Sequence, residues 1–313
     1  MVQKIAEDLI ARARAQLAQD IYFVPKKDCY ELFFRVGDER VFIRKYDLEQ
    51  MVTVIGHFKF KAGMNVGEKR RSQLGSCDYL VDGQVTSLRL STVGDYRGLE
   101  SLVIRLLHDE SRELHFWFDE IENLSSKCNR RGLYLFSGPV GSGKTTLMHE
   151  LAKRRFVGQQ IMSIEDPVEL KQDNILQLQL NEAIGMTYDN LIKLSLRHRP
   201  DLLIIGEIRD AETARAVIRA SLTGVTVFST IHAKSVPGVY ERLLELGVRQ
   251  EELKNSLQGI CYQRLIAGGG LVDFVERNFE MHQATRWNAQ VDCLVADGHL
   301  TKEGGQAEKI GDS

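Results

Sequence analysis

The sequence predicts an α/β protein in which a parallel-sheet domain over residues 132–296 follows a smaller α+β domain over residues 1–107. In the second half of the chain, continuously apolar stretches alternate with helix-length segments, which is typical of a parallel sheet covered on both faces. In the first half, short stretches of alternating polarity are separated by turns, which indicates half-buried strands. A length of 313 residues allows two domains, each with its own core.

Composition narrows the class of protein. Charged residues make up 27% of the chain and the formal net charge is −2, so the chain reads as globular, without the basic surplus of a protein that mainly coats nucleic acid. The five cysteines are scattered and form no C-x-x-C pair. This pattern supports neither a zinc ribbon nor a disulfide framework, and it predicts reduced thiols that mostly fill gaps in the core.

The first 20 residues predict an amphipathic helix. Ile5, Leu9, Ala13 and Leu17 recur every four residues, and the charged residues between them exclude the uninterrupted apolar stretch of a secretory signal. The apolar face is thin and lacks an aromatic anchor, so a helix on a domain surface is favoured over one that lies in a membrane. No apolar run is long enough to span a bilayer, so membrane association is expected to come through a partner.

The remaining elements are predicted in order along the chain. The smaller domain has strands at 30–35, 40–43, 79–81, 86–91 and 102–107 and a helix at 48–61, with turn-rich residues around Gly63, Gly67 and Gly75. Residues 108–131 are interpreted as a linker that runs into a docking helix. The larger domain has apolar strands at 133–137, 161–164, 202–205 and 225–230. The polar, glycine-containing tail over 297–313 is expected to be disordered.

The turn after the first apolar strand carries a phosphate-binding pattern. Residues 138–145 read GPVGSGKT, which fits G-x-x-x-x-G-K-[ST], and a strand precedes it and a helix follows it. These flanks disfavour a glycine-rich turn that binds nothing. Backbone N–H groups and the helix N-terminus would surround phosphate oxygens, with Lys144 at the β- and γ-phosphates and the Thr145 hydroxyl at Mg²⁺. The expected nucleotide-binding residues are Gly138, Pro139, Val140, Gly141, Ser142, Gly143, Lys144, Thr145 and Thr146.

Acidic residues follow two later strands. Glu207 comes just after the apolar run 202–205, where a metal-linked or water-orienting carboxylate of a P-loop ATPase belongs. Glu165 and Asp166 end the strand before Pro167, which donates no ladder hydrogen bond. One acid of this pair, with Glu165 as the candidate, can orient or deprotonate water near a γ-phosphate. The alternative for Glu207 is a surface acid at a strand end.

A histidine lies at the end of the last apolar strand. His232 closes the stretch Ser-Thr-Ile-His over 229–232, in the place where a sensor of the γ-phosphate would lie. A structural histidine with its hydrogen bonds satisfied is the alternative.

In this order, the four motifs resemble those of the secretion ATPase family, which powers type II secretion and type IV pilus assembly. The family's Walker A reads GPTGSGKT, and here it stands as GPVGSGKT. The family's acidic box resembles residues 164–169. Its Walker B motif resembles residues 206–213, and its histidine box resembles residues 229–232. Residues 68–75, 88–92 and 103–107 look like the second half of its amino-terminal domain, and residues 259–265 resemble its QRL helix. The resemblance covers most of residues 20–265.

Three departures narrow the resemblance. The chain lacks the four-cysteine zinc module of secretion-type members, and it begins directly at the second amino-terminal domain. Val225 replaces a histidine of the family's TGH box, which leaves the role of that box open. A short, zinc-free form with the run FKFKAGMNVGEKRRS over 58–72 is similar to the competence ATPases of Gram-positive bacteria.

The resemblance implies a RecA-like ATPase domain, a PAS-like amino-terminal domain and a homohexamer that binds ATP and Mg²⁺, without zinc, between the two domains. It also implies that arginines of the smaller domain neutralise charge on the transferring phosphoryl group, as arginine fingers do. Arg89 and Arg105 occupy the matching motifs. Arg71 and Arg209 are further candidates, and a surface ion pair is the alternative for each of the four.

The sequence is therefore interpreted as a hexameric motor ATPase that assembles a competence pseudopilus or type IV pilus-like structure for DNA uptake. It is expected in the cytoplasm at the inner face of the membrane, on a polytopic platform protein, without direct contact to nucleic acid. A nucleic-acid translocase on the same core, a pilus retraction ATPase and a non-catalytic nucleotide-binding scaffold are the alternatives. The intact Lys144, Glu165 and Glu207 disfavour the scaffold.

Overall fold

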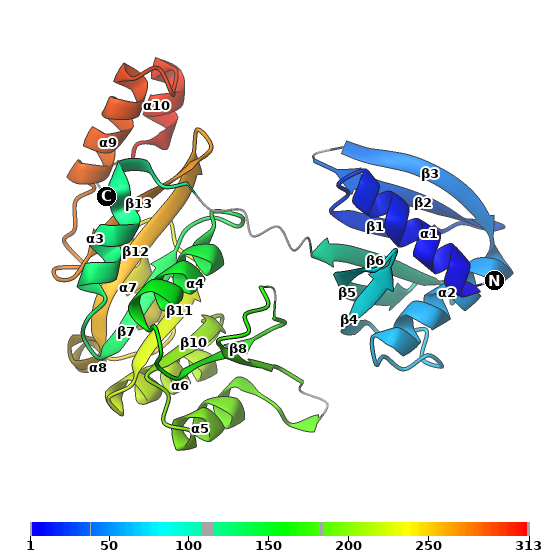
Figure 1. The fold of residues 1–313 in the computed structure, drawn as a ribbon, viewed down its shortest axis with the longest axis horizontal. Coiled ribbons are helices and arrows are strands. Elements are labelled where there is room, and N and C mark those ends of the chain that lie inside the picture. Colours follow the sequence, from blue (N-terminus) through cyan, green and yellow to red (C-terminus); the bar gives the residue numbers. More distant parts are fainter. Residues whose placement is uncertain (1, 38, 108–114, 169, 182–183, 312–313) are drawn as a thin grey trace. The chain divides into compact units, whose positions relative to one another are not determined.

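The computed structural model describes residues 2–37, 39–107, 115–168, 170–181 and 184–311, which form two compact units, Met1–Ser111 and Arg112–Ser313 (Figure 1). The first part of the predicted linker, residues 108–114, lies outside the described residues. No helix among the described residues is both long and apolar enough to cross a membrane. The smaller unit has one hydrophobic core, and the larger unit has two, one on each face of its sheet.

The smaller unit is a six-stranded antiparallel sheet with two helices. Its strand order is β3-β2-β1-β6-β5-β4. The apolar faces of the helices pack with the inward-facing strand residues in one core. The predicted strands are confirmed with longer bounds, and β1 was not predicted. The elements are α1 (Val2–Ala15), β1 (Asp20–Pro25), β2 (Cys29–Val36), β3 (Glu39–Asp47), α2 (Leu48–Lys61), β4 (Gln73–Val81), β5 (Gln84–Gly94) and β6 (Glu100–Leu107).

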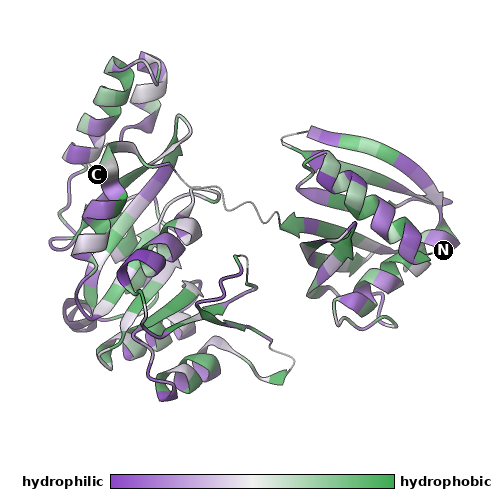
Figure 2. Cartoon of the chain, viewed as in Figure 1, coloured by the Kyte–Doolittle hydropathy of each residue, from purple (hydrophilic) through white to green (hydrophobic). Residues whose placement is uncertain are grey.

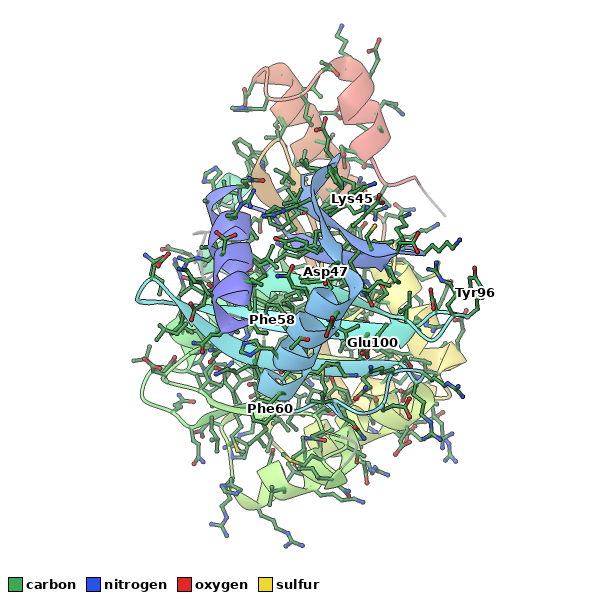
Figure 3. All side chains as sticks on the ribbon, turned by 90° about the vertical axis from the view of Figure 1, so that its right-hand side faces the viewer. Lys45, Asp47, Phe58, Phe60, Tyr96 and Glu100 are labelled. Carbon is green, nitrogen blue, oxygen red and sulfur yellow. The ribbon has the colours of Figure 1, made fainter. Side chains whose placement is uncertain are left out.

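The helix α2 follows from its sequence. The Asp47 side chain accepts a hydrogen bond from the backbone N–H of Gln50 and so caps the helix N-terminus. Val54 and Phe58 lie four residues apart and are both fully buried, whereas Phe60 is 74% exposed (Figure 3). This spacing places one face of the helix in the core. The predicted helix over 48–61 is confirmed.

The larger unit is a seven-stranded sheet with helices on both faces. Its strand order is β13-β12-β7-β11-β10-β8-β9, and only β13 pairs antiparallel with its neighbour. The elements are η1 (Trp117–Asp119), α3 (Glu120–Lys127), β7 (Gly132–Ser137), α4 (Lys144–Arg155), β8 (Ile161–Glu165), β9 (Leu176–Gln179), α5 (Tyr188–Arg197), β10 (Leu202–Glu207), α6 (Ala211–Leu222), β11 (Thr226–Ile231), α7 (Val236–Glu245), α8 (Gln250–Ser256), β12 (Leu257–Ile266), β13 (Gly269–Val275), α9 (Thr285–Ala296) and α10 (Lys302–Glu308).

Alternate residues of the central strands enter two different cores. Leu133 and Leu135 of β7 join the core beneath α6, whereas Tyr134 and Phe136 join the core beneath α4. Burial on both faces explains why these strands read as continuously apolar, and the central strands are mostly green in Figure 2. The predicted parallel sheet is confirmed.

The predicted QRL helix is wrong, because residues 259–265 lie within the strand β12. This strand fills the position between β7 and β13 and pairs with both. A Cβ on Gly259 would lie 2.7 Å from the Phe274 ring and 3.0 Å from the Tyr134 ring, so the backbone packs directly against aromatic side chains. The helix was expected from the resemblance alone, whereas Ile260 and Tyr262 and the pairing on both edges favour a strand.

The tail, which the sequence predicts to be disordered, contains the helix α10. The indole N–H of Trp287 donates to the Glu308 carbonyl, and the Asn288 side chain hydrogen-bonds the backbone of Ile310. A Cβ on Gly305 would lie only 2.3 Å from Val295, so α10 packs closely on α9. These tertiary contacts order the tail, although its polar, glycine-containing composition predicts disorder.

The five cysteines are free, as predicted, but only two of them are buried. Cys128 and Cys261 lie in the core beneath α4, and the other three are partly or fully exposed. Core filling therefore accounts for fewer of the thiols than the composition suggested.

Candidate functional site

The turn between β7 and α4 forms a phosphate-binding loop. Gly138, Gly141 and Gly143 have φ values of 145°, 75° and 84°, a region that favours glycine. A Cβ on Gly138 would lie 2.0 Å from the backbone oxygen of Gln263 and 2.8 Å from the hydroxyl of Ser142. The loop backbone therefore approaches the neighbouring strand β12 too closely for any side chain. Since α4 begins at Lys144, the loop also leads into a helix N-terminus.

The side chains of this loop fit a nucleotide phosphate chain. The ammonium group of Lys144 donates to the carbonyls of Gly138, at 2.9 Å, and Pro139, at 2.7 Å, which holds the cation inside the loop. The buried hydroxyl of Ser142 has no hydrogen-bond partner among the described residues. Thr145 follows in the first turn of α4. The loop thus offers one cation and two hydroxyl groups beside a helix N-terminus, the groups that a triphosphate with Mg²⁺ requires.

The carboxyl ends of β8 and β10 bring the predicted acidic residues to one edge of the sheet. These strands pair in parallel through Ile205 and Ile164, so the acids that follow them meet there. Glu207 lies 2.9 Å from Arg209 and 3.4 Å from the Nε2 atom of His232. The structure therefore unites the predicted Walker B acid and the predicted histidine.

Arg209 links the two acidic motifs. Its guanidinium group contacts Glu207 at 2.9 Å and donates to Asp166 at 3.3 Å. Burial lowers the pKa of Arg209, but the hydrogen bond and charge of Glu207 outweigh burial and raise that pKa above its usual value. Arg209 is thus a fixed positive charge between the two carboxylates. This position favours the interpretation of Arg209 as an ion-pair partner within the site over that of an arginine finger.

Glu165, the last residue of β8, is buried at this edge of the sheet. It is 5% exposed and accepts hydrogen bonds from the Ser163 hydroxyl at 2.6 Å and from the Gln177 amide at 3.0 Å. Gln177 lies on β9, which pairs with β8 at this point. Two donors therefore fix the orientation of the candidate general base. Sequence reasoning found Glu165 from its box but missed Gln177, because β9 carries no motif.

Tyr188 is a further member of the acidic edge that the sequence did not reveal. Burial raises the pKa of its phenol to about 12, and the charges of Asp166, Glu207 and Glu165 add to this effect. The phenol therefore stays protonated near neutral pH and presents an O–H donor close to the carboxylates. In the sequence, Tyr188 is marked only by the preceding Thr187, which caps the N-terminus of α5. A helix cap does not indicate a catalytic or binding role.

The histidine segment is joined to the strand that enters the loop. The hydroxyl of Ser137, at the end of β7, donates to the carbonyl of Ala233 and accepts from its N–H. Since Ala233 follows His232, this pair of hydrogen bonds fixes the histidine backbone next to the start of the phosphate-binding loop. The Thr230 hydroxyl likewise donates to the Gly206 carbonyl, one residue before Glu207.

The two candidate arginines of the smaller unit lie opposite each other on neighbouring strands. Arg89 of β5 and Arg105 of β6 are register partners, and like charges in this arrangement repel. The guanidinium group of Arg105 donates to Asp20 at 2.8 Å, and that carboxylate is buried. Asp20, which the sequence did not single out, therefore offsets part of the repulsion and orients Arg105.

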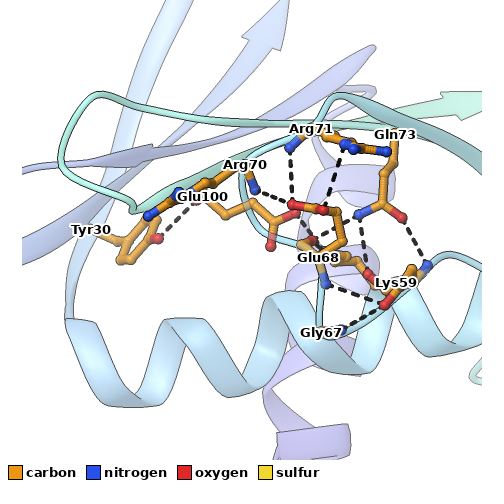
Figure 4. Close-up of polar contacts among 9 residues, drawn as sticks. Tyr30, Lys59, Gly67, Glu68, Arg70, Arg71, Gln73 and Glu100 are labelled. Atoms are coloured by element: carbon orange, nitrogen blue, oxygen red, sulfur yellow. Dashed lines mark hydrogen bonds and ion pairs between the residues drawn. The ribbon is translucent and has the colours of Figure 1, made fainter.

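Arg71 lies in a loop that a buried ion pair anchors (Figure 4). Its side chain is 87% exposed, and its backbone N–H donates to Glu68. The fully buried ammonium group of Lys59 donates to the Glu68 carbonyl and to the Glu100 carboxylate, both at 2.6 Å. Lys59 thus joins the loop that contains Glu68 and Arg71 to Glu100, the first residue of β6.

Replacing Lys59 with alanine is expected to destabilise the smaller unit by about 3–5 kcal/mol, because Glu100 would remain buried without its cation. The measurement is urea-induced unfolding of the purified chain. Lys61→Ala, which removes an exposed lysine at the end of the same helix, is the control and should unfold like the parent. If Lys59→Ala also unfolds like the parent, the ion pair does not anchor the loop.

A largely parallel sheet, a phosphate-binding loop after β7 and carboxylates at the ends of β8 and β10 define a RecA-like P-loop ATPase. The family model described as "Type II/IV secretion system protein" matches residues 1–300. The chain therefore belongs to the type II/IV secretion system protein family, and it is an ATP-hydrolysing enzyme.

Individual relatives agree with this assignment. The chain is 72% identical over 310 residues to "Competence protein ComGA" of Streptococcus pneumoniae (strain ATCC BAA-255 / R6), with 99% of each chain covered. It is 37% identical over 275 residues to "Competence protein ComGA" of Bacillus subtilis (strain 168), with 85% of this chain and 76% of that one covered. The fold is shared with the solved "Pilus Retraction Motor PilT", with a TM-score of 0.77, 21% identity and 97% of each chain covered.

Proposed function

We propose that this chain is the motor ATPase that assembles a competence pseudopilus, a type IV pilus-like structure, for DNA uptake. The main support is an ordered ATPase site in a chain that is 72% identical along its length to a protein named for competence. The position of Lys144 inside the phosphate-binding loop and the contact between Glu207 and His232 also support the proposal. The ATP hydrolysis that drives the proposed motor is therefore assigned to residues of the larger unit.

The proposed division of labour follows from the contacts. Lys144 would bind the β- and γ-phosphates, and Thr145 and Glu207 would hold Mg²⁺, which would supply neutralisation of the charge on the phosphate oxygens. Glu165, oriented by its two donors, positions or deprotonates the attacking water. His232, in contact with Glu207, senses the γ-phosphate. No zinc is assigned a role.

The motor is proposed to be a homohexamer with a PAS-like smaller domain. Arg89 and Arg105 of that domain are proposed to act as arginine fingers on the transferring phosphoryl group. Arginine fingers stabilise charge that develops on the phosphoryl oxygens in the transition state. The register pairing of Arg89 with Arg105 supports this role, because it places two cations side by side, whereas the ion pair of Arg105 with Asp20 is what the structural alternative for that residue expects.

Removing either arginine is expected to lower kcat far more than ATP affinity. A trans-acting finger contributes about 10³ to 10⁵ in rate in well-studied GTPases, so even a weaker effect is measurable. The measurement is kcat, ATP affinity, melting temperature and ring mass for Arg89→Ala and Arg105→Ala. Arg97→Ala is a control, because Arg97 lies in the same unit and pairs with Asp95. Unchanged kcat in both folded variants would remove these arginines from the mechanism.

The proposed location is the cytoplasm, at the inner face of the cell membrane. A polytopic platform protein of the pilus machine would hold the motor there and receive its force. Direct binding of nucleic acid is not part of the proposal. Hydrolysis that DNA stimulates would instead favour a translocase on the same ATPase core.

Deleting the gene and scoring transformation together with surface pilin tests this proposal. Loss of both is the expected result, because an assembly motor is needed before any pilin reaches the surface. Loss of transformation with pilin retained or increased on the surface would favour a retraction motor. Normal transformation and normal surface pilin would contradict the proposed function, whatever the ATPase activity of the purified chain.

A further inference from the structure

We propose that Gln263 is a positioning residue of the phosphate-binding loop, which it holds from the neighbouring strand. Gln263 lies on β12, directly beside β7, the strand that enters the loop. Its side-chain amide Nε2 donates to the carbonyl of Ser142 at 2.6 Å, and the residue is 1% exposed. It does not belong to the motifs that carry the reaction, and it acts on the nucleotide only through the loop.

The strand β12 contacts the loop near both of its ends. At the start, the backbone oxygen of Gln263 occupies the space that a Cβ of Gly138 would need. Near the end, its side chain binds Ser142, two residues before Lys144. One residue of β12 thus lies against the loop near its start, at Gly138, and binds it near its end, at Ser142.

The loop needs such an external constraint. Its three glycines at positive φ have access to more backbone conformations than other residues. The N-cap position of α4, Gly143, has no side-chain cap. The hydrogen bond from the Ser142 N–H to the Pro139 carbonyl, at 3.3 Å, is long. The 2.6 Å hydrogen bond from Gln263 is therefore a strong link between the end of the loop and the sheet.

The orientation of the amide indicates what the glutamine contributes. Because the Ser142 carbonyl only accepts hydrogen bonds, the amide must present its N–H₂ group to it. The Oε1 atom of Gln263 is then buried without a hydrogen-bond partner among the described residues, which is unfavourable. Methionine would fill a similar volume without this cost. The glutamine is therefore placed to supply a donor to the loop rather than to improve packing.

A loop without this donor should bind phosphates less well, whether or not hydrolysis follows. The β-phosphate is common to ATP and ADP, so both ligands should lose affinity to the same extent. The Glu207 cluster lies on other strands and keeps its contacts, so turnover at saturating ATP should change little. This separation of affinity from turnover distinguishes a positioning residue from a catalytic one.

The test compares Gln263→Met with Arg264→Ala in the full chain. Arg264 is the next residue of β12 and pairs with Glu308 of α10, so its removal weakens the same strand without changing the Gln263 amide. In Gln263→Met, the Kd values for MgATP and MgADP are expected to rise together by roughly threefold to tenfold, the range of one hydrogen bond. Calorimetry gives the affinities, phosphate release gives kcat, and the melting temperature reports folding.

Parent-like affinities in Arg264→Ala and a parent-like melting temperature in Gln263→Met complete the expected result. Unchanged affinities in folded Gln263→Met would overturn the inference, and so would an equal loss of affinity in Arg264→Ala. If Gln263→Met does not fold, Gln263→Leu also removes the amide donor without burying a charge, and it makes the same test. The result concerns ATP binding alone, so it is independent of the proposed role in pseudopilus assembly.

Discussion

Replacing Lys144 with alanine is expected to abolish measurable ATP binding at ordinary nucleotide concentrations. Lys144 is 9% exposed, and its ammonium group lies between the carbonyls of Gly138 and Pro139, where phosphate oxygens would approach. A hydrogen bond to a charged group contributes about 1.5–3 kcal/mol, so the loss of the proposed contacts of Lys144 with the β- and γ-phosphates weakens binding on the order of 100-fold or more.

Calorimetry with MgATP measures this effect. Lys153→Ala is the matched control, because Lys153 is an exposed lysine in the last turn of the same helix α4. The control should bind ATP like the parent, and a parent-like melting temperature in Lys144→Ala would show that the fold is intact. Near-native affinity in Lys144→Ala would contradict the assignment of the phosphate-binding loop.

Replacing Glu207 with glutamine is expected to leave ATP bound but to stop its hydrolysis. Glutamine keeps the shape of the side chain while it removes the negative charge that Arg209 and His232 contact. The same charge is proposed to hold Mg²⁺ and the water network, so its loss should act on the transition state rather than on binding. A decrease in kcat on the order of 100-fold or more is expected, in line with the removal of an electrostatic contact at the reacting centre.

Phosphate release and ATP affinity measured together separate the two effects. Glu212→Gln, a change to an exposed acid in the first turn of α6, is the control and should hydrolyse ATP normally. If turnover of Glu207→Gln stays within about threefold of the parent, less than roughly 1 kcal/mol of barrier, Glu207 is not catalytic. A loss of ATP affinity without a decrease in kcat would also contradict the role given to it.

The motifs of the larger unit could be predicted because a parallel sheet delivers strand ends to one edge. Once the apolar strands are recognised, Glu165, Glu207 and His232 must come close to the phosphate-binding loop. Their partners could not be predicted in this way. Tyr188 and Gln177 reach the acidic edge through connections that carry no sequence pattern, and the fold alone brings them there.

The segment 259–265 shows where the resemblance fails as a guide to secondary structure. The resemblance implied a helix, but Ile260 and Tyr262 favour a strand, and β7 and β13 pair with the two edges of the segment. Gln263 therefore contacts Ser142, 121 positions earlier in the chain. The same holds for Asp20 and Arg105, which meet only because β1 and β6 are neighbours in the sheet.

The central claim is that ATP hydrolysis at this site drives pseudopilus assembly. Its most direct test is a deletion strain that expresses Glu207→Gln at the parental level, scored for surface pilin and transformation beside a strain that expresses the parent chain. Because this variant is expected to fold and bind ATP, it separates hydrolysis from the presence of the protein. The account predicts restored pilin and transformation with the parent chain and neither with the variant. Surface pilin and transformation at the parental level with a variant that does not hydrolyse ATP would contradict it.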